Sequence, residues 1–443
     1  MRIVIGGAGF ISPKSPGGHP GRGQNNNPLP HSSPSAVITF AGARDRYQSA
    51  LALQEHGALE ALVTDAYCPA AWSRFPLLGA SFRRLAAARN AEGLPAGKIV
   101  TSWTSCLRSL GARIDRRKDS PHLAAADRLL SAKAAQVALA RKVPLIAYSY
   151  YAEPAFRRLA DSGLPRILFQ VHPQARFLRD LFVREASRVP EAAASLMREA
   201  EMSPAYGDAD GSFAESDAVI CASSFTKHSL EFAGVKAPVH VVGYGVDLDL
   251  FSARTFAPSA RPLTVGFIGA LSQRKGARYL LAALASLPKG KAKLIIYTRA
   301  EVDRDLIRGF ESVDVEIRGG LSDAALAADI KQCDLIALPS IAEGFGLVIL
   351  EAMACGVPVL CTTSTGGADF ITHRRNGLLI EPGSAEAIQQ ELDWALTHRD
   401  ELFQIGQAAR EEAQRHSWTA YRRNFFAAYA ASVSAASADL CQP

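Results

Sequence analysis

The sequence lacks several features that would assign it to a common class of protein. It has seven cysteines in 443 residues, and none of them forms a CxxC pair or a spacing with histidine that is typical of zinc sites. We therefore expect small core residues in a reducing compartment, not a disulfide framework. No apolar run reaches the roughly 18 residues that a transmembrane helix needs, so no membrane span is predicted.

A strong charge of either sign is also missing. The formal net charge is +6, the charged fraction is 21% and the hydrophobic fraction is 48%, which is enough for the cores of two or three domains. No nucleic-acid reading motif accompanies the positive charge. We therefore expect no nucleic-acid partner.

The first residues, MRIVIGGAGFI, resemble the start of a nucleotide-sugar epimerase or another Rossmann enzyme. The third glycine of that pattern is missing, and Pro13 stands where the helix should begin. A segment rich in Gly, Pro, Asn and Ser follows, and it has no apolar region typical of a signal peptide. We predict a disordered or poorly ordered extension over residues 1–35, with an NAD enzyme based on Gly6 to Gly9 as an alternative.

The most informative stretch runs from Asp334 to Cys361 and reads DLIALPSIAEGFGLVILEAMACGVPVLC. The apolar run Leu335 to Leu338 predicts a buried parallel strand, and Leu347 to Ala354 predicts a helix that Gly356 ends. Val357 to Cys361 predicts the next strand. The loop between the first strand and the helix therefore lies at the carboxyl end of a strand, where open α/β sheets bind ligands.

The residue types in this loop suit a ligand that carries phosphate and hydroxyl groups. Gly344 and Gly346 allow a close approach of the backbone, and the amides of Gly346, Leu347 and Val348 would point out of the helix N-terminus toward a phosphate. Glu343 and Glu351 are placed to face one polar ligand, with Glu351 accepting hydrogen bonds from a ribose diol. A single glutamate in such a place is more often a helix cap or a solvated acid.

The motif EGFGLVILEAMACGVPVL resembles the signature of the retaining glycosyltransferases of family 4, which have the GT-B fold. The resemblance implies an α/β protein with two Rossmann-like domains facing a central cleft, a nucleotide-diphosphate sugar as donor, and neither cofactor nor metal. It also implies that Glu343 lies near the donor sugar and that Glu351 binds the nucleotide ribose. The donor-binding residues that we predict are Gly269, Gly344, Phe345, Gly346, Leu347, Val348, Glu351, Gly366 and Gly367.

A second glycine-containing loop follows the predicted strand Leu263 to Ile268. Gly269 allows close approach, and the adjacent cations Arg274 and Lys275 suit a diphosphate, because a helix start otherwise favours anions. The family pattern is Gly-Arg-Leu followed by Lys-Gly. Here Ala270 replaces the arginine while Lys275 is kept, so Arg274 is our candidate for the missing charge.

Two parts of the preceding sequence are candidates for the other side of the cleft. Gly42, Ala43 and Arg44 follow the predicted strand Val37 to Phe40 and are expected to form an acceptor-side loop, or else an ordinary turn. His172 follows the predicted strand Arg166 to Val171. A histidine there either hydrogen-bonds the donor sugar, handles the acceptor proton, or has no special role. We predict Glu343, Lys275, Arg274 and His172 as catalytic residues.

Two pairs of aspartates have the DxD spacing of metal sites in other glycosyltransferases. Asp247 and Asp249 lie in the predicted linker, and Asp208 and Asp210 lie in a stretch without a predicted strand. Neither pair follows a sheet strand beside the predicted nucleotide site. We therefore expect no metal site.

The predicted organisation has five parts. They are the extension 1–35, a first Rossmann-like domain 36–239 on the acceptor side, a linker 240–262, a nucleotide-sugar domain 263–415, and a terminal segment 416–443 whose helix crosses back to the first domain.

The stretch from residue 72 to residue 118 is basic and amphipathic. Its cations are Arg74, Arg83, Arg84, Arg89, Lys98, Arg108, Arg113, Arg116, Arg117 and Lys118, against only Glu92 and Asp115. Such a segment suits peripheral contact with an anionic membrane, a site for an anionic acceptor, or a solvated basic face.

Taken with the resemblance, these features predict a metal-independent, hexosyltransferase-type enzyme that transfers a sugar with retention of configuration. The acceptor is a glycan, a lipid-linked glycan or a small molecule. We expect a cytoplasmic protein, with the inner face of the membrane as the other option. The alternatives are a non-catalytic nucleotide-sugar binder and a GT-B epimerase or phosphorylase.

Overall fold

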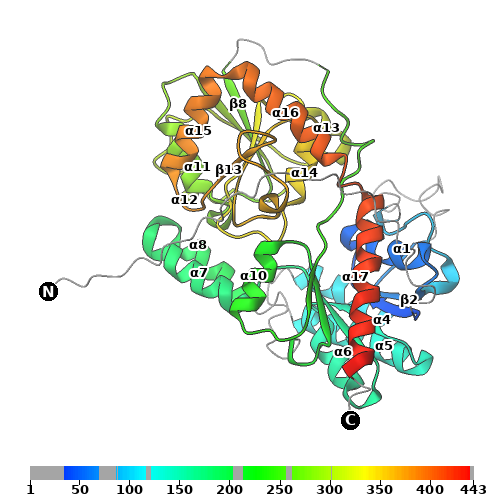
Figure 1. Ribbon diagram of the computed structural model, residues 1–443. Helices are drawn as coiled ribbons and strands as arrows, with labels where there is room; N and C mark the ends of the chain where they lie inside the picture. Colours follow the sequence, from blue (N-terminus) through cyan, green and yellow to red (C-terminus); the bar gives the residue numbers. More distant parts are fainter. Residues whose placement is uncertain are drawn as a thin grey trace, which may run out of the picture. The chain divides into compact units, whose positions relative to one another are not determined.

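The structure is a computed structural model (Figure 1). It describes residues 34–68, 86, 88–115, 121–202, 213–255, 262–300 and 302–439. The predicted extension up to residue 33, much of the stretch 72–118, and the aspartates at positions 208 and 210 lie outside the described residues. No helix within the described ranges is long and apolar enough to cross a membrane.

The first part of the chain forms a parallel sheet in the order β3-β2-β1-β4-β5-β6-β7. The strand bounds are β1 Ala36–Thr39, β2 Leu59–Thr64, β3 Ile99–Thr101, β4 Leu145–Tyr148, β5 Arg166–Gln170, β6 Ala218–Cys221 and β7 Val239–Val241. The central strands are short apolar runs, and β1, β4 and β6 are buried at every position. Such runs are typical of parallel strands that are covered on both faces.

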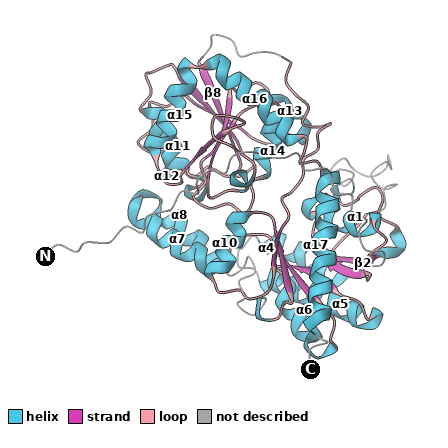
Figure 2. Ribbon diagram, viewed as in Figure 1, coloured by secondary structure: helices cyan, strands magenta, loops and turns pink. Residues whose placement is uncertain are grey.

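Helices connect these strands and cover the sheet (Figure 2). Their bounds are α1 Gln48–Glu55, α4 Trp103–Asp115, α5 Pro121–Arg141, α6 Ala152–Leu159, α7 Ala175–Arg188, α8 Ala193–Met202 and α10 Ser224–Phe232. The Ser223 side chain accepts a hydrogen bond from the Thr226 amide and caps α10.

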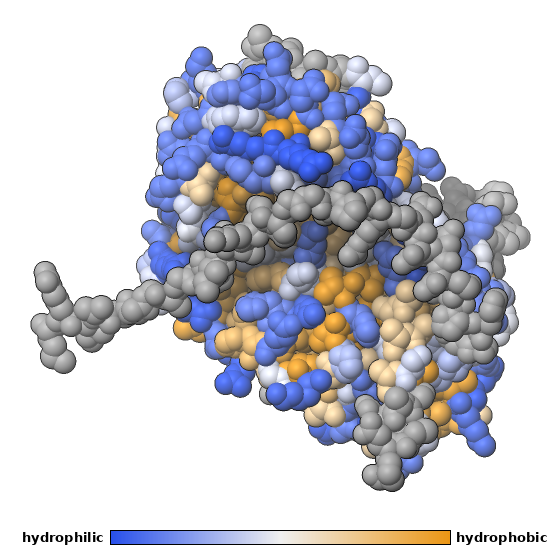
Figure 3. All heavy atoms as spheres, in the orientation of Figure 1, coloured by the Kyte–Doolittle hydropathy of each residue, from blue (hydrophilic) through white to orange (hydrophobic). Residues whose placement is uncertain are grey.

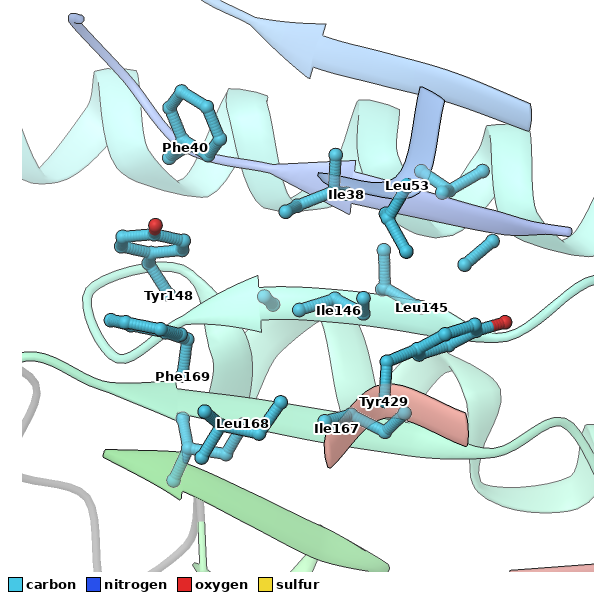
Figure 4. Close-up of a cluster of buried hydrophobic side chains, with 14 of the residues drawn as sticks. Ile38, Phe40, Leu53, Leu145, Ile146, Tyr148, Ile167, Leu168, Phe169 and Tyr429 are labelled. Atoms are coloured by element: carbon cyan, nitrogen blue, oxygen red, sulfur yellow. The ribbon is translucent and has the colours of Figure 1, made fainter. Parts of the chain in front are cut away.

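Aromatic side chains fill the core of this first domain near the carboxyl ends of its strands (Figure 4). The ring centroids of Phe40 and Tyr148 are 5.0 Å apart, and those of Tyr148 and Phe169 are 4.4 Å apart and stacked. Tyr429, which comes from the last helix of the chain, is buried in the same cluster.

The second part of the chain forms another parallel sheet, in the order β10-β9-β8-β11-β12-β13. The strand bounds are β8 Leu263–Ile268, β9 Ala292–Tyr297, β10 Val315–Arg318, β11 Leu335–Leu338, β12 Val359–Thr362 and β13 Leu378–Ile380. The helix bounds are α11 Ala277–Ala285, α12 Arg304–Ile307, α13 Asp323–Ile330, α14 Leu347–Ala354, α15 Ala385–Thr397 and α16 Arg399–Ala413. This order confirms the predicted pair of Rossmann-like domains.

The last helix, α17 Trp418–Asp439, lies in the predicted terminal segment and packs against the first domain. The Arg422 guanidinium binds Glu55 and Gln48 of α1 at 2.8 and 2.6 Å. In Figure 3, hydrophilic side chains cover most of the upper part of the drawn face and apolar side chains gather below it.

The structure also contains helices where we predicted no element. α7 and α8 form a helical hairpin in the connection between β5 and β6, and their apolar side chains pack on the second domain. Leu178, Phe182 and Leu196 of this hairpin form one buried cluster with Leu306 and Ile341. α16 is another such helix, and it packs on α14.

Candidate functional site

Lys275 lies in a tight loop after the first strand of the second domain. The loop leaves β8 at Gly269, which has φ +123°, and ends at Gly276, which has φ +76°. A Cβ on Gly276 would lie 2.0 Å from the Pro339 carbonyl oxygen, and a Cβ on Gly269 would lie 3.1 Å from the Lys275 Nζ. Glycine is therefore required at both positions if the lysine is to keep its place.

Glu343 lies opposite these cations in the loop between β11 and α14. Its Oε2 is 3.2 Å from the Lys275 Nζ and accepts a hydrogen bond from Arg274 at 3.1 Å. Burial alone would raise the pKa of this carboxyl, but the Arg274 and Lys275 charges outweigh it and lower the pKa to about 2. Glu343 is therefore ionised at neutral pH.

Arg274 is placed differently from Lys275, although both were predicted to hold a diphosphate. Its Nε donates to the Glu199 Oε2 at 2.7 Å. Its Nη1 donates to the Ala342 carbonyl oxygen at 3.0 Å and to the Glu343 Oε2 at 3.1 Å. These partners hold the guanidinium against the wall of the site, whereas Lys275 has Glu343 as its ion-pair partner.

His172 lies close to Glu343, on the first domain. Its Nε2 is 2.6 Å from the Tyr150 hydroxyl, and the Arg44 guanidinium lies 4.6 Å from the centre of the Tyr150 ring. Burial, with a smaller effect from Arg274, lowers the pKa of His172 to about 4. The imidazole is therefore neutral at neutral pH, which suits a hydrogen-bonding role better than proton abstraction.

The loop that carries Glu343 is docked on the first domain through Gly344. The Gly344 carbonyl oxygen accepts hydrogen bonds from the Ser223 hydroxyl at 2.6 Å and the Thr226 hydroxyl at 3.1 Å. A Cβ at this position would lie 2.5 Å from the Val171 carbonyl oxygen. The two domains thus meet at a glycine that directly follows Glu343 and approaches the residue before His172.

Glu351 lies one turn into α14 but does not line the same cavity as Glu343. It lines a cavity of about 180 Å³ together with residues of the first loop, the linker and α17, including Ala43, Arg46, Asp247, Leu347 and Trp418. Burial raises the pKa of Glu351 to about 7. The two glutamates therefore lie on either side of the α14 N-terminus.

The remaining predicted donor residues surround Phe345. Gly346 is the N-cap of α14 with φ +86°, which places Leu347 and Val348 in the first turn. The Gly366 amide donates to the Phe345 carbonyl oxygen at 2.8 Å, and a Cβ on Gly366 would lie 2.4 Å from the Phe345 ring. Gly366 thus allows this close packing, whereas a Cβ on Gly367 would lie 2.6 Å from the Cys361 Sγ. In the first domain, Gly42 donates its amide to Asp65 at 2.8 Å.

Three side chains near the site, those of Glu199, Tyr150 and Ser223, were not predicted. Each makes its contact through tertiary structure, since Glu199 is far from Arg274 in the chain and Ser223 is far from Gly344. The role of Ser223 as a donor to Gly344 has no signal in the local sequence.

The linker aspartates belong to a turn that the Asp247 side chain stabilises. The Asp247 carboxylate accepts hydrogen bonds from the amides of Asp249 and Leu250 at 3.2 and 3.0 Å. Within the described part of the chain, no group of three or more His, Cys, Asp or Glu side chains is arranged to hold a metal ion.

A larger hollow of about 800 Å³ lies elsewhere, at the amino ends of strands of the first sheet, beside Arg166, Asp217 and Lys236. It contains none of the predicted site residues. Ligands of open parallel sheets bind at the carboxyl ends of the strands, where Lys275, Glu343 and His172 lie. We therefore take the smaller cavities at that edge as the candidate site.

Solved structures share the fold of this chain over nearly its whole length. Sucrose-phosphate synthase from Thermosynechococcus elongatus covers 91% of this chain and 100% of its own, with a TM-score of 0.60 and 18% identity. HepE from Anabaena, solved in complex with UDP and glucose, covers 90% of this chain and 100% of its own, with a TM-score of 0.58 and 18% identity. The chain has the GT-B fold.

The sequence comparisons concern mainly the second domain. Residues 253–412 match the model of the family described as glycosyl transferases group 1. A D-inositol 3-phosphate glycosyltransferase of Segniliparus rotundus is 28% identical over 239 residues, which are 50% of this chain and 53% of that protein. A GDP-mannose-dependent alpha-(1-6)-phosphatidylinositol monomannoside mannosyltransferase of Mycobacterium tuberculosis is 31% identical over 218 residues, 44% and 56% of the two chains. This GT-B chain spans about half the length of the curated relatives it matches.

Proposed function

We propose that this GT-B protein transfers a sugar, of the hexosyl type, from a nucleotide-diphosphate sugar to an acceptor hydroxyl, with retention of configuration as in family 4. The observation that carries the proposal is the group formed by Lys275, Glu343 and His172, which lies where the carboxyl edges of both sheets meet. A nucleotide-sugar donor is consistent with the match to the glycosyl transferases group 1 and with the UDP and glucose bound by HepE.

In the proposed complex, Lys275 and the amides at the start of α14 bind the diphosphate. Glu351 accepts hydrogen bonds from the ribose diol, and Glu343 and His172 hydrogen-bond the sugar. These groups neutralise the charge that develops on the leaving diphosphate, so that no divalent ion is needed. Full transfer activity in excess EDTA is expected. Activity that is lost in EDTA and restored by magnesium or manganese would contradict this part of the proposal.

In the reaction, the bond between the anomeric carbon and the diphosphate oxygen breaks, and the nucleoside diphosphate leaves with the electron pair. The anomeric carbon, which resembles an oxocarbenium ion in the transition state, then bonds to the acceptor oxygen on the face that the diphosphate leaves. Because both oxygens are on the same face, the acceptor proton passes to the departing phosphate oxygen. A pKa of about 4 makes His172 a weak base for that proton.

The experiment starts with a thermal-shift screen of the whole chain against UDP, GDP and ADP, because a ligand that binds the folded state raises the melting temperature. Product analysis with labelled UDP-glucose and GDP-mannose then separates the candidates. A retained glycoside supports the proposal. Inversion at carbon 2, phosphate-dependent release, or binding without turnover would indicate an epimerase, a phosphorylase or a non-catalytic binder.

We also propose that the first domain contacts an anionic membrane surface at the inner face of the cytoplasmic membrane, where lipid-linked acceptors are reached. The support comes from the described part of the basic stretch. Trp103 and Leu107 lie one turn apart on α4 and are 60% and 68% exposed, beside the exposed Arg108. An exposed aromatic and aliphatic pair flanked by cations suits the interface of an anionic bilayer.

Sedimentation with vesicles tests this contact. Binding to vesicles that contain phosphatidylglycerol, weakened several-fold in a Trp103→Ala, Leu107→Ala variant, is expected. Val241→Ala is a suitable control because Val241 is exposed on β7, away from α4. Equal binding of both variants and the parent would exclude α4 as the contact.

A further inference from the structure

The α7–α8 hairpin contributes the part of the candidate site that the sequence does not predict. A cavity of about 80 Å³ lies beside Glu343, and its lining includes Leu178 and Phe182 of α7 and Glu199 of α8 as well as His172 and Arg274. The hairpin belongs to the first domain in sequence, yet it reaches the second domain at this cavity. It therefore forms one wall of the site.

The wall has an apolar part and an acidic part. Leu178 and Phe182 are almost completely buried in the cluster that contains Ile341 and Ala342 of the β11–α14 loop. Glu199 lies beside them and binds the Arg274 Nε at 2.7 Å. Glu185 of α7 also contacts the loop of the second domain that carries Arg274, because its carboxylate accepts a hydrogen bond from the Gln273 side-chain amide at 2.9 Å.

The charged side chains that line the cavity are two carboxylates and one guanidinium. Its lining includes the carboxylates of Glu199 and Glu343, and Arg274 is bound to both of them. His172 is uncharged at neutral pH, and Lys275, which pairs with Glu343 at 3.2 Å, is not part of the lining of the cavity. A carboxylate entering this space would meet two carboxylates whose arginine partner is already engaged, and burying such a charge without a partner is costly.

We propose that Leu178, Phe182 and Glu199 form a wall of the donor-sugar subsite and make it select neutral sugars over sugars that carry a carboxylate. The inference rests on the proposed function, which places the sugar beside Glu343. Sugar hydroxyls donate hydrogen bonds to the carboxylates of Glu199 and Glu343, and the apolar face of the sugar ring packs on Leu178 and Phe182. A uronic acid at the same position adds a third negative charge instead of a donor.

Binding measurements with matched donors test the selection. The full chain is titrated with UDP, UDP-glucose and UDP-glucuronate, and with GDP, GDP-mannose and GDP-mannuronate, so that the test does not depend on the base. For the base that binds, the neutral sugar nucleotide is expected to bind at least tenfold more tightly than its uronate. Equal affinity for the two, or a preference for the uronate, would overturn the inference.

The role of Glu199 is tested by Glu199→Gln, which removes one negative charge and keeps the size of the side chain. Its ratio of affinities for neutral sugar nucleotide and uronate is expected to fall at least threefold, while the affinity for the nucleoside diphosphate alone stays unchanged. Glu191→Gln is the matched control, because Glu191 lies on the same hairpin, is 60% exposed and is 3.9 Å from Arg278. An unchanged ratio in Glu199→Gln would overturn the role of Glu199.

The outcomes also separate this inference from the proposed function. If none of UDP, GDP and ADP binds, the proposed function fails. If they bind but the parent chain does not discriminate between neutral and acidic sugars, only the selection fails. The comparison in the parent chain needs no variant, so it remains decisive even if Glu199→Gln does not fold.

Discussion

Lys275 is the residue to which we assign the binding of the leaving diphosphate. It is 15% exposed, it has Gly269 beside its ammonium group, and it shares Glu343 with Arg274. A preorganised donor to a developing negative charge typically contributes about 2.7–4 kcal/mol to the transition state. Lys275→Ala is therefore expected to lower turnover about a hundred- to a thousandfold in a steady-state transfer assay.

Two controls accompany this variant. Lys289→Ala removes an exposed lysine of the same domain and should leave turnover unchanged. The melting temperature shows whether Lys275→Ala keeps the fold. Near-normal turnover in a folded Lys275→Ala protein would remove the diphosphate role from this lysine.

Glu351 gives a prediction about pH. Burial raises its pKa to about 7, and the groups that face it include Arg46, Asp45 and Asp247. Because only the ionised carboxyl can accept both hydrogen bonds of a ribose diol, nucleotide affinity should rise as the pH increases through 7 and fall as it decreases. Calorimetric titration of the nucleoside diphosphate that binds, between about pH 6 and pH 8, measures this change.

The Glu351→Ala variant completes that test. It should bind nucleotide more weakly at every pH, and the step near pH 7 should disappear. The fold is expected to persist, because the residue lines a cavity. Unchanged affinity in the variant would argue against the ribose contact.

At the scale of elements, the βα alternation was predictable because buried parallel strands are apolar runs that glycine and proline delimit. β8 begins and ends where the sequence predicts, and α14 does too. The α7–α8 hairpin was not predicted, because its apolar residues Leu178 and Phe182 face the other domain instead of their own sheet. The contact of Glu199 with Arg274 depends on that packing and was equally hidden.

The docking of the β11–α14 loop on the first domain depends on Gly344. A methyl group there would overlap the Val171 carbonyl oxygen, so the loop would have to move away from β5. Overpacking of this kind typically costs about 1–3 kcal/mol. Gly344→Ala is expected to lower the free energy of unfolding by that order in a urea titration, and to lower turnover because Glu343 moves with the loop.

Gly97→Ala is the matched control for this effect. Within the described part of the chain, no atom lies within 4 Å of the position that its Cβ would take, and its φ is not positive. It should leave both measurements unchanged. A Gly344→Ala protein as stable and active as the control would show that the loop tolerates displacement.

At the scale of the whole molecule, the prediction that two Rossmann-like domains are paired depended on the resemblance of the EGFG motif to a known signature. Hydrophobic periodicity indicates each sheet by itself, but it does not show that Arg44, Tyr150 and His172 of one domain lie near Glu343 of the other. That arrangement depends on contacts such as those of Ser223 and Thr226 with Gly344.

Deletion of residues 1–33 tests the predicted irrelevance of the first glycine motif. All residues that we place in the site follow Pro34, whose carbonyl oxygen accepts a hydrogen bond from the Tyr429 hydroxyl. The shortened chain is expected to keep the nucleoside diphosphate affinity and melting temperature of the full chain. Loss of binding, or NAD binding that only the full chain shows, would favour the dinucleotide interpretation of Gly6 to Gly9.

The return of α17 to the first domain has a consequence for synthesis. Phe425, Tyr429 and Val433 are part of the hydrophobic core that also contains β1, yet nearly the whole chain is translated between them. Domains generally fold in the order in which they leave the ribosome. Here the core of the amino-terminal domain stays incomplete until the carboxyl-terminal residues leave the ribosome. Residues 263–415 can therefore reach their native packing first.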